Sequence, residues 1–249
     1  MPTTAITYIG GPTALIEYAG LRVVTDPTFD PPQEYPAPGE SSLVKTRGPA
    51  LSRADVWPVD LVLLSHHLHK DNLDYEGLEL IAQGALTFST HDAADDLWGG
   101  SVLGFDNWES HKLGEVTVTV VPALHGPPGS EKLLGTVVGF VLEASGCPTL
   151  YVSGDNASIA LVEQIAGRFP DIDIAVLFAG AARVPDLDAT LTMTSTDAAR
   201  AAGILNPRVV VGLHTDDWEH FSEGRAELEA ALAPTGLLVA TPRGERVEL

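Results

Sequence analysis

Short apolar runs separated by glycine open this chain, and they limit the fold more than any other feature of the sequence. The runs Ala5–Ile9, Ala14–Tyr18 and Leu21–Thr25 are apolar or β-branched, with glycine between them. Such runs favour strands joined by turns. The sequence therefore predicts an antiparallel β opening.

Further along the chain, the pattern changes to strands that alternate with helices. Apolar or alternating runs predict strands at 60–65, 116–120, 135–142, 149–152, 172–178 and 209–212. Periodicity predicts helices at 75–83, 159–166, 197–202 and 223–232, and Thr194 with Asp197 fits a capping box. This order is typical of layered sheets with helices outside, an α/β (α+β) architecture. Because we find no repeat or linker, we expect a single domain over residues 1–249.

Charge and cysteine content exclude several classes of protein. The 14 Lys and Arg residues stand against 34 Asp and Glu residues, a net charge of −20, so we expect no nucleic-acid partner. The single Cys147 excludes an internal disulfide and a Cys-rich zinc module. No apolar run approaches the ~18 residues of a membrane span, and the N-terminus lacks a signal-peptide pattern. We therefore expect a cytoplasmic protein without a membrane span, and no feature indicates an oligomeric state.

The segment from Pro27 to Pro58 is rich in proline and has no sustained periodicity. Its seven prolines exclude a regular helix or a central strand. A loop of this length inside a compact domain is usually functional or mobile. Together with the segment around Trp218 and Phe221, it is our candidate for the wall of a substrate pocket.

Three of the eight histidines fall within four positions, directly after a predicted strand. His67 and His69 are two residues apart, so an extended backbone directs both imidazoles to the same side, and Asp71 can join them. Zn²⁺ accepts imidazole and carboxylate ligands together. The run predicts a metal site, and the alternative is a polar turn whose histidines form local hydrogen bonds.

Further ligands are expected at other strand ends. His125, Asp155 and His214 each stand where a predicted strand gives way to a loop. Functional groups held by a rigid scaffold usually occupy such positions. For Asp155, a simple turn carboxylate is the competing interpretation.

These residues, in their order along the chain, resemble the metallo-β-lactamase superfamily. The matching segments are Gly10–Glu17, Val24–Pro27, Ser65–Asn72, Pro122–Gly126, Ser153–Asn156 and Gly212–His214. The sequence looks most similar to the branch that contains L-ascorbate-6-phosphate lactonase and N-acyl-phosphatidylethanolamine-hydrolysing phospholipase D. The resemblance implies the metallo-β-lactamase fold, a four-layer αββα sandwich with the metal site at one edge of two sheets.

The resemblance also implies a metal-dependent hydrolase with a defined set of ligands. His67, His69 and His125 would hold one metal ion. Asp71 and His214 would contribute to a second, and Asp155 would bridge the two. Zn²⁺ is the expected cofactor, as one ion or two.

Two positions depart from the pattern of the superfamily. The superfamily has His-x-His-x-Asp-His, and Asn72 stands at the last position here. An amide is a weaker ligand that binds through oxygen, so the second site is expected to lose affinity or to accept a harder cation such as Mn²⁺. Gly11 replaces a histidine that the branch often has near the start.

The register of the histidine run is also open. A Ser or Thr normally stands directly before the first ligand, and here Ser65 precedes His66. If the turn bulges by one residue, His66 and His69 form the ligand pair and His67 points away. Strict spacing favours His67, and His66 and Asn72 are the reserve ligands.

The expected chemistry follows from the charge of the metal ion. A dication lowers the pKa of bound water to about 7 and polarises a carbonyl or phosphoryl oxygen. Asp71 and Asp155 are the expected catalytic carboxylates, which orient the water or move its proton. Asp26 is expected to hold a ligand histidine from behind.

We therefore expect hydrolysis of an ester, lactone, amide or phosphodiester bond in a small-molecule substrate. A lyase or cyclase that uses the same site, or a metal-poor binding module that keeps the fold, are the alternatives. No serine-hydrolase, dinucleotide or phosphate-loop motif is present. His91, His111 and His220 have no patterned neighbour and are expected at the surface or in caps. Lys45, Arg47 and Lys70 are weaker candidates for contacts with an anionic substrate.

Overall fold

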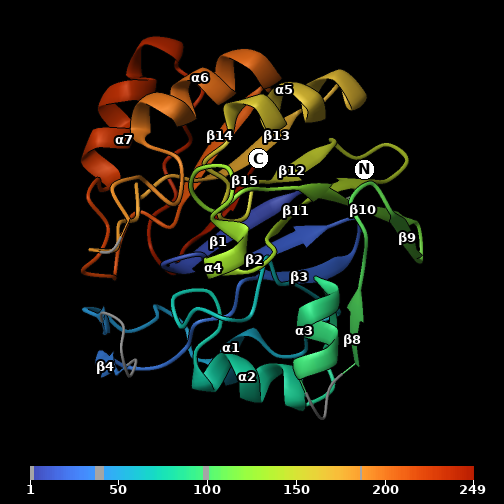
Figure 1. The fold of residues 1–249 in the computed structure, drawn as a ribbon. Coiled ribbons are helices and arrows are strands. Elements are labelled where there is room, and N and C mark those ends of the chain that lie inside the picture. Colours follow the sequence, from blue (N-terminus) through green and yellow to red (C-terminus); the bar gives the residue numbers. More distant parts are fainter. Residues whose placement is uncertain (1–2, 37–41, 98–100, 186) are drawn as a thin grey trace.

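The computed structural model describes residues 3–36, 42–97, 101–185 and 187–249. Its elements form four layers: helices, a sheet, a second sheet and further helices (Figure 1). Helices α5, α6 and α7 cover the outer face of one sheet, and α1, α2 and α3 cover the outer face of the other (Figure 1). The αββα sandwich expected from the sequence is confirmed.

The N-terminal sheet has the strand order β15-β1-β2-β3-β6-β7-β8. Its strands are β1 (Ala5–Gly10), β2 (Thr13–Tyr18), β3 (Leu21–Thr25), β6 (Leu61–Leu63), β7 (Leu86–Ser89), β8 (Ser101–Gly104) and β15 (Arg246–Glu248). Strands β1, β2 and β3 are antiparallel, as their glycine-separated runs predict. From β3 onward the neighbouring strands run parallel.

The second sheet has the strand order β14-β13-β12-β11-β10-β9. Its strands are β9 (Ser110–Leu113), β10 (Val116–Pro122), β11 (Val138–Glu143), β12 (Leu150–Val152), β13 (Ile174–Phe178) and β14 (Val209–Leu213). Strands β11 and β12 are antiparallel neighbours, as predicted, and β12, β13 and β14 run parallel.

Four of the helices, α2, α5, α6 and α7, lie close to the positions that the sequence predicts, whereas α1, α3 and α4 were not predicted. The helices are α1 (Arg53–Val56), α2 (Tyr75–Ala82), α3 (His91–Asp96), α4 (Glu131–Leu134), α5 (Ile159–Arg168), α6 (Ser195–Leu205) and α7 (Arg225–Leu232). The expected capping box of α6 is present, because Thr194 accepts a hydrogen bond from the Asp197 backbone and Asp197 accepts one from Thr194. In the proline-rich segment, α1 and a small hairpin of β4 (Gln33–Tyr35) and β5 (Leu43–Lys45) form where we expected irregular chain. Residues 37–41 of that segment lie outside the described residues.

Alternation of side chains along the strands builds the apolar core between the layers. Even-numbered residues of β10, such as Val116, Val118 and Val120, face the other sheet together with Phe140 and Phe178. The opposite face of the second sheet packs against α5, α6 and α7, and the outer face of the first sheet packs against α2 and its neighbours. The site must therefore form at an edge, because the interior between the sheets is apolar.

The carboxyl ends of five strands meet at one edge of the sandwich. Strands β3 and β6 are parallel neighbours, so their ends lie together. In the second sheet, β10 has the same direction as β12 and β14, since two antiparallel pairings separate it from β12. Loops that leave these ends bring distant segments together. Among the described residues, no helix combines the length and the apolar character that a bilayer crossing requires.

Candidate metal centre

The loop that follows β6 turns sharply, and the turn decides which histidines meet. Residues 65–73 form bends and turns rather than extended chain. His66 and His69 therefore converge, with His66 Nε2 lying 2.7 Å from His69 Nδ1. His67 points away, and its Nε2 lies 3.0 Å from Asp96 Oδ2. The geometry thus differs from the strict-spacing expectation and has the register with a one-residue bulge.

His125 completes a cluster of three imidazoles. Its ring centroid lies 5.3 Å from that of His66 and 5.1 Å from that of His69. His125 Nδ1 lies 2.9 Å from the backbone oxygen of Leu191, so Nδ1 donates there and Nε2 is left free as a ligand atom. One ligand atom from each of these three histidines lies within 4.8 Å of the others. Such a set can hold one cation.

Behind the cluster, Ser65 connects His66 to a buried carboxylate. Asp26, at the end of β3, accepts hydrogen bonds from Ser65 N at 2.7 Å and Ser65 Oγ at 2.9 Å. The hydroxyl lies 3.0 Å from His66 Nδ1. The Ser65 hydroxyl donates its proton to Asp26, so its oxygen accepts a hydrogen bond from His66 Nδ1. The proton of the neutral His66 ring therefore lies on Nδ1, and Nε2 keeps a lone pair that can bind a cation. Asp26 thus reaches the histidine through Ser65 rather than directly.

A second cluster contains Asp71, Asp155 and His214, all of them buried. Asp155 Oδ1 lies 3.0 Å from His214 Nδ1, and Asp71 Oδ2 lies 3.4 Å from His214 Nε2. Asp155 Oδ2 is 3.7 Å from His125 Nδ1. Asp155 therefore lies close to a histidine of each cluster.

Asn72 faces the second cluster with its amide. Its Nδ2 donates a hydrogen bond of 3.2 Å to Asp155 Oδ1, and the side chain is fully buried. The residue that departs from the family pattern thus contacts the central carboxylate. Asn72 Oδ1 has no partner among the described residues.

His220 also lies at this site, although its lack of a patterned neighbour in the sequence predicted a surface or capping position. Its Nε2 lies 3.0 Å from Asp71 Oδ2. Its ring packs against Phe221, with centroids 4.7 Å apart. The available signal was its position six residues after His214, beside two aromatic residues that we had placed in the pocket wall. His91 and His111 lie outside both clusters, as expected.

Burial and neighbouring charges set the protonation of these groups in the metal-free protein. Burial, followed by the neighbouring His69, holds the pKa of His66 well below its usual value. Burial also lowers the pKa of His69 to about 4. Although burial opposes the charged form of His214, the carboxylates of Asp155 and Asp71 raise its pKa to about 10. The first cluster therefore presents neutral imidazoles, whereas a proton on His214 lies between two carboxylates.

Several buried polar atoms of the site have no hydrogen-bonding partner within the described part of the chain. They are Asp155 Oδ2, Asn72 Oδ1 and His220 Nδ1. Buried polar atoms are rarely left unsatisfied without a reason. Imidazole nitrogens and carboxylate oxygens gathered in this way suit a divalent cation such as Zn²⁺. The residues therefore fit a metal centre.

Local backbone geometry allows the two sheets to approach at this point. Gly154 has a φ of +55°, and a Cβ there would lie 2.8 Å from Ser65 Cβ and would collide with the Val138 backbone oxygen. Only glycine, which has no Cβ, adopts this positive φ without strain and fits in so narrow a space. His214 itself has a φ of +57°, an uncommon value for a residue with a side chain.

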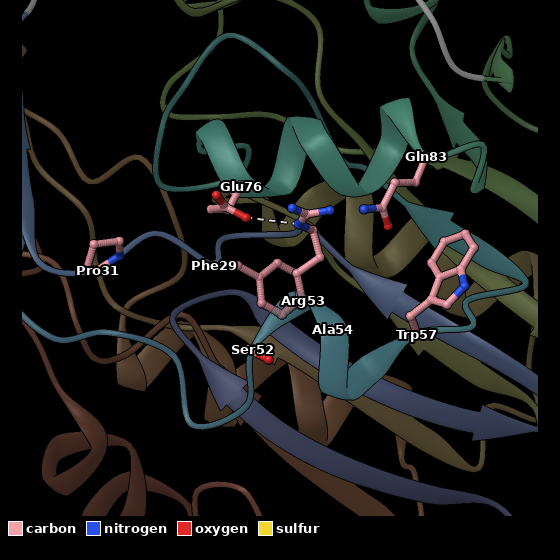
Figure 2. Close-up of a pocket in the computed structure, with 8 residues that line it drawn as sticks. All are labelled: Phe29, Pro31, Ser52, Arg53, Ala54, Trp57, Glu76 and Gln83. Carbon is pink, nitrogen blue, oxygen red and sulfur yellow. Dashed lines mark hydrogen bonds and ion pairs between the residues drawn. The ribbon is translucent and has the colours of Figure 1, made fainter.

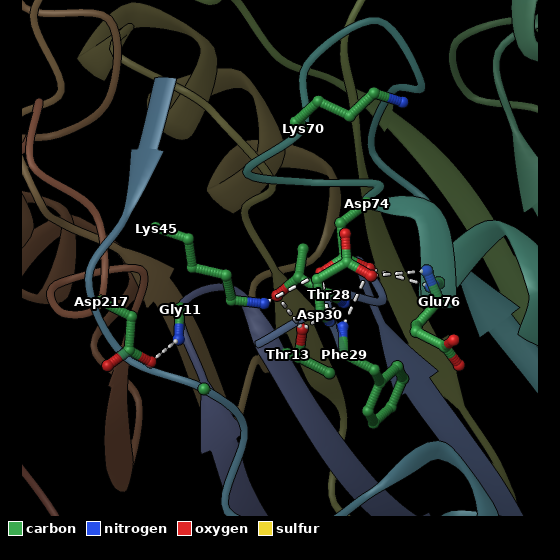
Figure 3. A network of polar contacts seen from close by, with 12 residues as sticks. Gly11, Thr13, Thr28, Phe29, Asp30, Lys45, Lys70, Asp74, Glu76 and Asp217 are labelled. Atoms are coloured by element: carbon green, nitrogen blue, oxygen red, sulfur yellow. Dashed lines mark hydrogen bonds and ion pairs between the residues drawn. The ribbon is translucent and has the colours of Figure 1, made fainter. Parts of the chain in front are cut away.

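The hairpin β4–β5 lies beside the segment that carries His220. The backbone of Lys45 bridges that of Trp218, and Tyr35 stacks on the Trp218 ring at 5.6 Å. Lys45 is buried, and its ammonium donates to Asp74 at 2.9 Å (Figure 3). Lys70 lies over the ring of Tyr75 at 4.8 Å. Lys45, one of the three cationic residues that we considered for substrate binding, is therefore already paired with a carboxylate of the protein.

A cavity of about 800 Å³ lies elsewhere. It is lined by residues of α1, α2 and the adjoining loops, among them Arg53, Trp57 and Glu76 (Figure 2). Figure 2 shows Arg53 and Glu76 paired across it, at 2.9 Å. It contains no residue of the two ligand clusters, so we do not assign the chemistry to it.

Comparisons with known proteins point to one family. A profile described as "Beta-lactamase superfamily domain" matches residues 21–215. A UPF0173 metal-dependent hydrolase of Pelotomaculum thermopropionicum is 30% identical over 210 residues, which cover 80% of this chain and 87% of the relative. These likenesses agree with the resemblance that the sequence motifs carry.

Solved structures share the fold over the whole chain. A possible metal-dependent hydrolase from Veillonella parvula has a TM-score of 0.86 at 20% identity, over 99% of this chain and all (100%) of that one. An isothiocyanate hydrolase from Delia radicum gut bacteria has a TM-score of 0.83 at 23% identity, over 98% and 99% of the two chains. At such identities these neighbours support the fold alone.

Proposed function

Because the chain belongs to the β-lactamase superfamily, and is a metal-dependent hydrolase, we propose that it hydrolyses an uncharged ester, lactone or amide at the edge of the sandwich. The observation that carries this proposal is the pair of ligand clusters on either side of Asp155. Both clusters lie at the carboxyl ends of strands, where loops are free to shape a substrate pocket.

We propose that Zn²⁺ is the cofactor. His66, His69 and His125 would hold one ion, and Asp71 and His214 would contribute to a second. Three neutral imidazoles are a ligand set that suits zinc. When bound, a divalent cation makes water acidic enough to attack a carbonyl group near neutral pH. His67 is not part of this set, since it faces Asp96.

The carboxylates would orient water and move protons. Asp155 accepts a hydrogen bond from Asn72 on Oδ1, which fixes the carboxylate and leaves Oδ2 directed toward His125. Asp71, at the end of the same histidine loop, would orient the water. Ser65 would hold His66 with Nε2 unprotonated, the form that can bind a cation.

The surroundings of the clusters favour an uncharged and partly apolar substrate over a phosphodiester. Leu68, next to His69, is 50% exposed, Leu133 of α4 is 66% exposed, and Tyr75 is 54% exposed. Leu68 approaches Gly135 at the end of α4, so both segments belong to one rim. The nearby ammonium of Lys45 is neutralised by Asp74. Exposed apolar side chains gathered around a polar site are typical of ligand-binding clefts.

Metal content and hydrolysis test the proposal together. Protein purified without chelator is expected to contain one or two equivalents of zinc, and His69→Ala and His125→Ala to lose at least one of them. His67→Ala is the matched control, because it removes an imidazole from the same loop but not from either cluster. It should keep wild-type metal content.

The metal-loaded protein is then screened against esters, lactones, acyl amides and phosphodiesters. An isothiocyanate is added because one structural neighbour is named for that activity. Chelator-sensitive hydrolysis of a neutral carbonyl substrate supports the proposal. Turnover of phosphodiesters alone, or turnover that survives complete metal removal, would contradict it.

A further inference from the structure

We propose that His220 is a ligand of the second metal ion and supplies the imidazole that the family pattern has at position 72. This inference rests on the proposed function, since it concerns the same centre. The second cluster otherwise has two carboxylates and one imidazole, from Asp71, Asp155 and His214. His220 would add a second nitrogen ligand from a loop on the far side of Asp71.

The distances between ligand atoms support this assignment. His220 Nε2 lies 3.0 Å from Asp71 Oδ2, and His214 Nε2 lies 3.4 Å from the same oxygen. Two ligand atoms of a tetrahedral zinc ion, with bonds of about 2.0–2.1 Å, lie about 3.3 Å apart. The distances from Asp71 Oδ2 to the two imidazole nitrogens are thus close to the distance between two ligand atoms of one zinc ion.

His220 is also largely shielded from solvent. Its side chain is only 14% exposed. In the metal-free protein the partner of Nε2 is Asp71 Oδ2, the carboxylate oxygen that would share the ion with it. A cation can therefore replace the proton between these two atoms without moving either side chain far.

Asn72, where the family pattern has a histidine, offers the second ion no imidazole. Its amide nitrogen is used by Asp155, at 3.2 Å. An amide offers a cation only a neutral oxygen, which is a weaker ligand than imidazole for zinc. A chain with Asn72 and no compensating imidazole would hold the second ion weakly.

The backbone around His220 is held firmly enough for a ligand. Arg183 N donates to the His220 backbone oxygen at 3.0 Å, and Glu219 N donates to Val44 O at 3.1 Å. The ring packs edge-on against Phe221, which also packs against His214. A side chain supported on both sides loses little further freedom when it binds a cation.

The competing role for His220 is a hydrogen bond that only positions Asp71. Zinc titration monitored by calorimetry separates the two roles in part. If His220 is a ligand, His220→Ala should weaken the second ion by at least ~100-fold, beyond the ~10–100-fold typical of residues that only orient ligands. Affinity for the first ion should stay within ~3-fold of wild type. His67→Ala is the control and should change neither step.

A compensating substitution makes the test sharper. In the double variant His220→Ala/Asn72→His, an imidazole returns at the position where the family pattern has one. Binding of the second ion should then recover. Recovery supports a shared ligand role. The proposal is overturned if His220→Ala binds the second ion with wild-type affinity. It is also overturned if the wild-type protein binds only one ion.

Wild-type crystals grown with excess Zn²⁺ provide a measurement that needs no variant. An anomalous difference map should place an ion within ~2.3 Å of a His220 ring nitrogen. An ion bound by Asp71 and His214 but more than ~3 Å from both nitrogens would overturn the proposal. Because these readouts measure metal and not turnover, they stand whether or not the hydrolysis screen succeeds.

Discussion

Replacing Asp74 with asparagine is expected to destabilise the protein by about 3–5 kcal/mol, because it breaks a buried ion pair at the end of the loop that carries His66 and His69. Asp74 is fully buried, and it accepts a hydrogen bond from Lys45 Nζ at 2.9 Å. It also accepts from the backbone of Phe29 and Asp30, at 2.9 and 2.7 Å (Figure 3), and from that of Gly77, at 2.9 Å. The last of these bonds caps α2.

The magnitude follows from the number of acceptors that are lost. Each carboxylate oxygen of Asp74 receives two donors, so an amide NH₂ in either orientation faces two donors that it cannot accept from. A buried donor without a partner costs about 1–3 kcal/mol. If the NH₂ group lies on the Lys45 side, a nearly inaccessible ammonium also loses its counterion.

Equilibrium unfolding in urea measures the effect, with the slope of the transition checked for constancy. Glu76→Gln is a matched control, because Arg53 and Glu76 pair at the same 2.9 Å but with side chains 23% and 46% exposed. Exposed pairs contribute only about 0–1 kcal/mol. Lys45→Met combined with Asp74→Asn should lose less stability than the two single changes added, by about 0.5–3 kcal/mol. A loss for Asp74→Asn no larger than for Glu76→Gln would refute the reasoning.

Three further predictions concern the loop and the strand ends that build the centre. Ser65→Ala removes the hydroxyl between Asp26 and His66 and should weaken binding of the first zinc ion by ~10–100-fold. Competition with a coloured chelator measures this affinity, and an unchanged value would contradict the role of Ser65 in orienting His66. Gly154→Ala should cost more than about 2 kcal/mol in urea unfolding, since the added Cβ meets Ser65 and the Val138 backbone at a positive φ, and a near-neutral result would mean that the two sheet ends move apart easily. In chelator-treated protein, His69 keeps a pKa of about 4 while the unfolded chain has about 6.5, so stability should fall as the pH drops from 6.5 toward 4, by up to about 1.4 kcal/mol per pH unit. The same slope in His69→Ala would contradict this assignment.

Patterns local to the chain predicted most of the framework. The glycine-separated runs became β1, β2 and β3, and the later alternation became parallel strands with outer helices. These features depend on side-chain alternation and helical periodicity, which operate over a few residues. The regular elements within the proline-rich segment were missed, because α1 and the β4–β5 hairpin are only three or four residues long.

The sequence by itself determined that His69, Asp71, His125, Asp155 and His214 stand at strand ends, since strand and loop are local properties. Which neighbours join them depended on contacts between distant segments. His66 rather than His67 meets His69 because Asp26, directly after β3, holds Ser65 and the loop bends after it. His220 reaches Asp71 because its segment pairs with β5, far away in the sequence. Only the tertiary structure decides such meetings, because a one-residue bulge or a loop crossing changes which side chains face the site without changing the residue pattern.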